Sequence, residues 1–147
     1  MLIRPIVTYG CETWAMTVTE QNHLLIFERW VLRKIYRPTQ DNDGTWSIKT
    51  NEELEILIKK ETILRFIKSQ RLCWAAHVIR MDTIRAVKKI TEWEPCLSRP
   101  VGRPRLRWLE QVEEDLRKMK VRNWREKCKD RGLLNEIVRQ ATTHQGL

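Results

Sequence analysis

The 147-residue sequence has no long apolar run: its longest unbroken apolar stretch has five members, from Leu72 to Ala76. A helix that crosses a bilayer needs roughly 20 apolar residues. The first residues, MLIRP, also lack the charged region, apolar region and cleavage site of a signal peptide. We therefore expect no transmembrane helix and no membrane partner.

Closely spaced cysteines are also missing. The four cysteines, Cys11, Cys73, Cys96 and Cys128, lie too far apart for a C-x-x-C knuckle. Cys73 and His77 are four residues apart, a spacing that suits two metal ligands on a helix, but two ligands do not make a zinc site. We interpret the cysteines as reduced thiols of an intracellular protein, in the nucleus or cytoplasm, that needs no metal and no cofactor.

The sequence carries none of the common catalytic signatures. It has no phosphate-binding glycine loop and no nucleophile elbow. Its aspartates are scattered, and only Asp41 and Asp43 are close together, in a turn-rich stretch where a two-metal site would need further ligands. We therefore expect that this chain is not an enzyme.

Basic charge, in contrast, is in excess. Lys and Arg number 28 against 19 acidic residues, which gives a net charge of +9. Residues 1–58 carry 6 basic and 8 acidic side chains, whereas residues 59–147 carry 22 and 11, a net charge of +11. Such an asymmetry indicates an anionic partner for the C-terminal part, and nucleic acid suits it better than a membrane surface.

The most basic segment is SRPVGRPRLRW, residues 98–108, with four arginines and no acid. Unpaired guanidinium groups are too costly to bury, so these side chains must reach solvent or a polyanion. One interpretation is a semi-rigid loop whose arginines contact nucleic-acid phosphates. The other is a solvated linker that leads into a helix, with Pro104 near its first turn.

Helical periodicity dominates the rest of the sequence, and no segment shows strand alternation. Capping boxes at Thr17–Glu20 and Thr50–Glu53 predict helix starts. Further helices are expected at about 62–81 and 105–118, while Trp46 is expected to fold back onto neighbouring helices and Asn123 to cap a short helix. We expect an all-α fold, a small multi-helix bundle with two long loops. Its divisions are helices at 1–37, a polar loop at 38–49, a helical region at 50–94, a basic Pro/Arg loop at 95–104 and C-terminal helices at 105–147.

Four blocks of the sequence resemble a known family in the family's own order. They are LIRPIVTYGCETW at 2–14, VLRKI at 31–35, RLCWAAHVIRM at 71–81 and GRPRLRW at 102–108, and NWR at 123–125 fits as well. The chain resembles the region that follows the polymerase palm in the endonuclease-reverse transcriptases of non-LTR (LINE-type) retrotransposons. The resemblance implies thumb-like helices at 1–37 and a basic tail, with the catalytic aspartates of the palm outside this sequence. It also implies an incomplete core, because the surface that packs against the palm is left uncovered.

We therefore expect a non-catalytic nucleic-acid-binding fragment that binds RNA or DNA with little sequence specificity, since a thumb grips phosphates. The residues expected to make these contacts are Arg99, Arg103, Arg105 and Arg107, Trp108 as a stacking partner, and Lys68 and Arg71 as backbone contacts. One alternative is a protein–protein interaction module, or self-association through apolar faces left exposed. Another is a truncated reading frame without function.

Overall fold

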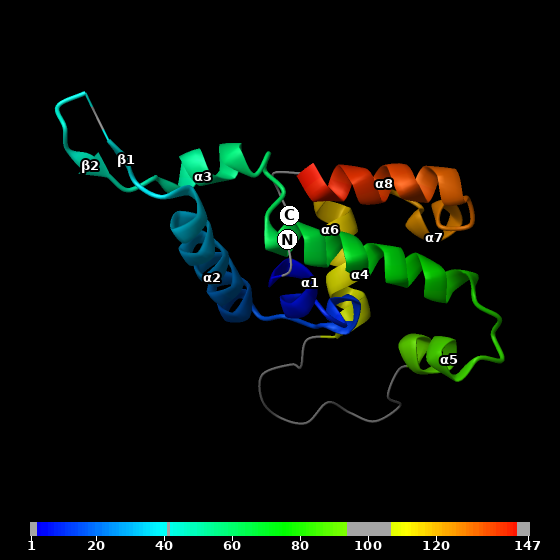
Figure 1. The fold of residues 1–147 in the computed structure, drawn as a ribbon. Coiled ribbons are helices and arrows are strands. Elements are labelled where there is room, and N and C mark those ends of the chain that lie inside the picture. The colour runs from blue at the N-terminus through cyan, green and yellow to red at the C-terminus, as the bar shows by residue number, and fades with distance from the viewer. Residues whose placement is uncertain (1–2, 41, 94–106, 144–147) are drawn as a thin grey trace.

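The structure, a computed structural model, describes residues 3–40, 42–93 and 107–143. It is compact and mostly helical, as expected from the sequence (Figure 1). In chain order its elements are α1 (Ile3–Val7), the 3-10 helix η1 (Cys11–Thr13), α2 (Val18–Tyr36), β1 (Thr39–Gln40), β2 (Trp46–Ser47), α3 (Asn51–Leu57), α4 (Ile63–Arg80), α5 (Ala86–Glu92), α6 (Trp108–Lys118), α7 (Trp124–Lys127) and α8 (Arg131–Thr143).

Both predicted capping boxes are present. The hydroxyl of Thr17 accepts a hydrogen bond from the backbone N–H of Glu20 at 3.3 Å, and the Glu20 carboxylate accepts one from the N–H of Thr17 at 2.6 Å. Thr50 and Glu53 repeat the arrangement at the start of α3. These reciprocal bonds satisfy N–H groups that the first turn of a helix leaves without a partner.

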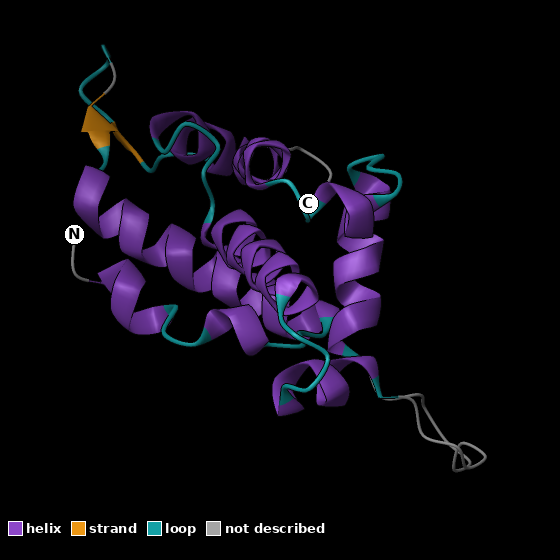
Figure 2. Ribbon diagram, turned by 90° about the vertical axis from the view of Figure 1, so that its right-hand side faces the viewer, coloured by secondary structure: helices purple, strands orange, loops and turns teal. Residues whose placement is uncertain are grey.

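Helix α4 is the central element of the fold. It packs against α8 and α6 on one side and against η1 and α2 on another (Figures 1 and 2). Eleven of its 18 residues are buried, which is more than a single apolar stripe would supply. Because so much of α4 is covered, several charged residues along it are buried as well.

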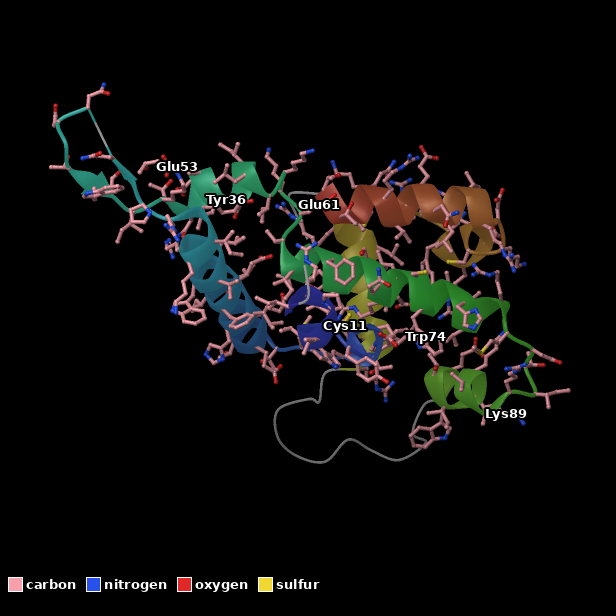
Figure 3. All side chains as sticks on the ribbon, viewed as in Figure 1. Cys11, Tyr36, Glu53, Glu61, Trp74 and Lys89 are labelled. Atoms are coloured by element: carbon pink, nitrogen blue, oxygen red, sulfur yellow. The ribbon has the colours of Figure 1, made fainter. Side chains whose placement is uncertain are left out.

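Two main apolar clusters surround α4. One joins α4 to α6 and α8 and consists of Leu72, Ala75, Val112, Leu116, Ile137 and Ala141. The other joins the start of α4 to the N-terminal segment and consists of Cys11, Met16, Ile63, Leu64 and Ile67. Cys11, labelled in Figure 3, lies where η1 packs against α4. The fold therefore has a continuous helical body on both sides of one buried helix.

The loop between α2 and α3 differs from its prediction. Thr39 pairs with Ser47 and Gln40 with Trp46 in a short antiparallel hairpin, which projects from the end of α2 away from the helical body (Figures 1 and 2). Trp46 is 67% exposed, so the expectation that it folds back onto the helices was wrong. The hairpin holds the indole at a distance from the apolar clusters.

Two further details of the fold differ from the sequence-based expectations. Asn123 precedes α7, but it has a left-handed backbone with φ of 51°, and its side chain makes no capping hydrogen bond. Helix α5 was not predicted as a separate element, because its apolar residues Val87 and Ile90 remain exposed. Across the described ranges, no helix combines the length and the apolar character that a bilayer span requires.

Candidate nucleic-acid interface

The structure places the predicted site residues in three different settings. Arg99, Arg103 and Arg105 lie outside the described residues. Arg107 and Trp108 stand at the start of α6, and Lys68 and Arg71 lie in the middle of α4. The predicted residues that are described therefore do not form one surface.

Lys68 and Arg71 are buried, and both face Asp115 of α6. Their side chains are 5% and 1% exposed. The guanidinium of Arg71 donates to the Asp115 carboxylate, and Lys68 Nζ lies 3.5 Å from Asp115 Oδ1. Burial lowers the pKa of Lys68, and the neighbouring Asp115 charge partly offsets this effect. The structure buries both cations away from phosphates outside the body, and it therefore does not place Lys68 and Arg71 where the expected contacts to a nucleic-acid backbone would be made.

Gln111 extends this polar cluster to the N-terminal segment. Its Oε1 accepts hydrogen bonds from Arg71 Nη1 at 2.7 Å and from the backbone N–H of Met16 at 3.1 Å. Its Nε2 donates to the carbonyl of Met16 at 2.6 Å. The cluster thus holds α4, α6 and the segment before α2 together. Lys68 and Arg71, which the sequence suggested as binding residues, support the fold here.

Trp108 is anchored through its indole. Its Nε1–H donates to the backbone carbonyl of Glu12 at 2.8 Å, and the ring packs against the cluster formed by α4, α6 and α8. Its neighbour Arg107 is 36% exposed, and its Nε lies 3.9 Å from Glu110 Oε1. Trp108 therefore fastens the start of α6 to η1, while the Arg107 side chain remains accessible to solvent.

Exposed cations gather instead at the C-terminal end of α4. A cleft of about 810 Å³ lies there between α4, the start of α5 and the turn before α8. Its lining includes His77, Arg80, Asp82, Arg85, Lys129 and Arg131. These residues come from three separate segments, so their spacing along the sequence does not group them.

A second hollow, of about 610 Å³, is mainly apolar. Trp14, Met16, Leu24 and Phe27 line it where the segment before α2 meets α2. Beyond it, α2 exposes Ile26 and Trp30 and other apolar side chains, and side chains of α2 project into solvent on the side away from α4 (Figure 3). This surface is typical of a face that another protein segment covers.

The described cysteines have different surroundings. Cys11 and Cys128 are buried, and burial raises the pKa of each thiol, whereas Cys73 is exposed. Within residues 3–40, 42–93 and 107–143, no group of three or more His, Cys, Asp or Glu side chains is placed to hold a metal ion.

Comparison with known proteins gives a similarity to a transposon-derived protein. The chain is 25% identical, over 149 aligned positions, to an uncharacterized transposon-derived protein of Caenorhabditis elegans. The alignment covers 97% of this chain and 53% of the nematode protein, so the chain spans about half of that protein's length. No family model and no solved structure matches the chain. The similarity supports a transposon-related origin for this sequence.

Proposed function

We propose that this chain is a non-catalytic nucleic-acid-binding module derived from the thumb and C-terminal region of a non-LTR retrotransposon reverse transcriptase. The ordered blocks at 2–14, 31–35, 71–81 and 102–108 support the derivation. The similarity to a transposon-derived protein over nearly the whole chain agrees with it. The proposed partners are RNA or DNA inside the cell, in the nucleus or cytoplasm.

The observation that carries this proposal is the excess of basic charge in the C-terminal part of the chain. Residues 59–147 have a net charge of +11. Among the described residues of this part, Arg65, Lys68 and Arg71 are buried together with Asp115, which removes only two units of net positive charge. The remaining excess of nine attracts a polyanion, and long-range attraction of this kind supplies most of non-specific nucleic-acid binding.

Low sequence specificity follows from the kind of contact. Lys and Arg side chains that reach phosphates fix the position of a nucleic acid but do not distinguish its bases. Of the aromatic residues near the basic segment, Trp108 already uses its N–H group within the fold. We therefore expect affinities that depend strongly on salt and weakly on sequence.

The test is the salt dependence of binding by the full chain. If about 4 to 6 phosphates are neutralised, the slope of log affinity against log salt concentration should be roughly −3 to −5. Single-stranded and double-stranded oligonucleotides of unrelated sequence should behave alike within this range. No binding at low salt, or a slope near zero, would overturn the proposal.

A second candidate function is protein interaction through the apolar surface of α2. The hollow beside Trp14 and Phe27 and the exposed side chains of Ile26 and Trp30 favour it. Apolar association depends little on salt, because it arises from surface removed from water. The same salt series therefore separates the two functions.

A further inference from the structure

The cleft at the C-terminal end of α4 combines four cations with one carboxylate. Arg80, Arg85, Lys129 and Arg131 line it, and Asp82 is the acidic residue of its described lining. The cations come from α4, from the residue before α5 and from the segment around the start of α8, which meet at one end of the helical body (Figure 1). The fold thus concentrates positive charge in a concave place.

Backbone contacts hold this cleft in shape. Arg80 Nη1 donates to the carbonyl of Cys128 at 2.7 Å and so joins the end of α4 to the end of α7. Lys88 Nζ donates to the carbonyls of Ile79 and Met81, each at 2.9 Å, and so joins α5 to the last turn of α4. The three segments are therefore fixed relative to one another before any ligand binds, which lowers the cost of ordering a site.

The remaining cations of the cleft have no ion-pair partner among the described residues. Arg85, Lys129 and Arg131 are exposed, and none of them forms an ion pair with a residue in the described part of the chain. Asp130, which lies next to two of them, accepts a hydrogen bond from the N–H of Gly132 at 2.7 Å and so caps α8. Several guanidinium groups around one concavity match the oxygen atoms of a phosphate group.

We propose that this cleft binds a phosphate group of a nucleic acid, with Arg80 as a fixed wall and Arg85 and Arg131 as the groups that close on the phosphate oxygens. The proposal rests on the proposed function and adds a defined site to it. A phosphate in the cleft contacts cations from three segments at once.

The experiment compares two variants of the full chain that lose the same charge. Arg85→Gln with Arg131→Gln removes two cations of the cleft whose side chains form no hydrogen bond or ion pair with the described residues. Arg117→Gln with Arg139→Gln, at exposed positions of α6 and α8 outside the cleft lining, is the matched control. Circular dichroism and thermal melting establish that both variants keep the wild-type helix content and stability.

Binding is measured with an oligonucleotide labelled at its 3′ end. We expect the cleft variant to bind about tenfold more weakly than wild type, because hydrogen bonds between charged groups are lost. The control should weaken binding by no more than about threefold, since those charges act only through screened long-range attraction. Equal weakening in both variants would overturn the proposed phosphate site in the cleft but would leave the proposed nucleic-acid binding of the chain intact. If the wild-type chain does not bind at all, the proposed function fails and the cleft proposal fails with it.

Two further binding measurements identify the chemical group that the cleft recognises. Oligonucleotides with a 5′-phosphate or a 5′-hydroxyl distinguish a terminal phosphate from a phosphate within the backbone: a preference for the 5′-phosphate that the cleft variant loses assigns the terminal group, and equal affinities assign the backbone. An oligoglutamate peptide tests carboxylates. If the peptide binds as tightly as the oligonucleotide, and the cleft variant loses both, the site is a general anion site and the proposal of a phosphate site is overturned.

Discussion

Arg71 of α4 and Asp115 of α6 form an ion pair inside the helical body, where burial of both side chains is nearly complete. Asp115 also faces Lys68, so one carboxylate serves two buried cations. The Nε atom of Arg71 has no hydrogen-bond partner among the described residues. The geometry makes Asp115 the residue on which the burial of both cations depends.

Replacement of Asp115 by Asn should therefore destabilise the fold strongly. Removal of one partner of a buried ion pair leaves an uncompensated buried charge, which costs about 3–5 kcal/mol of unfolding free energy. Chemical denaturation of Asp115→Asn and of the wild type measures the difference. Glu114→Gln, an exposed change on the same helix next to Lys118, is the control and should alter stability by less than about 1 kcal/mol. Similar stabilities for the two variants would contradict the structural role of Asp115.

Trp108→Phe tests whether the indole N–H fastens α6 to η1. The substitution keeps an aromatic ring but removes the donor to the Glu12 carbonyl, which should cost about 1 kcal/mol of stability. Trp93→Phe is the control, because Trp93 is 67% exposed and makes no comparable bond in the described structure. A loss of nucleic-acid affinity in Trp108→Phe without a loss of stability would instead favour the stacking role expected from the sequence.

The sequence was sufficient to predict most of the helices and the starts of two of them. Thr17 and Thr50 define two helix starts through bonds that lie within four residues, so short-range spacing contains the information. The hairpin and α5 leave their apolar residues Trp46 and Ile90 exposed. Because these residues do not belong to a buried apolar stripe, the periodicity of the sequence does not predict the two elements.

The site could be predicted only in part, because it depends on which faces of α4 are covered. Arg71 looked like a solvent-facing cation until α6 and η1 were placed against it. A signal did exist: Asp115 stands three residues after Val112 and beside Leu116, within the apolar stripe of its helix. An acidic residue in such a stripe indicates a buried cation on a facing helix. Arg85 and Arg131, in contrast, meet only through the tertiary fold.

Glu28 should make stability depend on pH in the acid range. Burial raises its pKa, although the N–H of Ile63 donates to its carboxylate at 2.8 Å and Arg4 lies nearby. The folded protein therefore holds this proton at pH values where the unfolded chain has lost it. The contribution of Glu28 to stability is fully present below the unfolded pKa of 4.5 and is lost as the pH rises through the higher folded pKa.

The comparison with Glu28→Gln isolates this effect, because an amide oxygen still accepts the bond from Ile63. The variant should be more stable than the wild type at neutral pH and equally stable below about pH 4.5. Glu136→Gln, at an exposed position of α8, is the control for the loss of one carboxylate. Denaturation midpoints measured between acid and neutral pH give the result. A stability difference between Glu28→Gln and the wild type that does not change with pH would contradict the raised pKa of Glu28.

The outer surface of α2 should cause self-association of the isolated chain. Ile26 and Trp30 are 61% and 55% exposed, and contiguous apolar patches of this kind promote pairing with other surfaces. Ile26→Gln with Trp30→Gln should shift the chain towards monomer in sedimentation velocity at several concentrations. A wild-type chain that is a monodisperse monomer with a sharp cooperative melting transition would contradict the prediction that this surface causes self-association.

The basic segment provides the most direct separation of binding from folding. Arg103→Ala, Arg105→Ala and Arg107→Ala together remove three cations, and each lost phosphate contact should lower the magnitude of the salt slope by about one. Helix content should be unchanged, because Val112 and Leu116 still bury the inner face of α6 and Arg107 makes no side-chain capping bond. Affinity at several salt concentrations, measured beside far-ultraviolet circular dichroism, decides between the two interpretations of this segment. An unchanged slope would make it a solvated linker, and a loss of helicity would mean that its arginines support the fold.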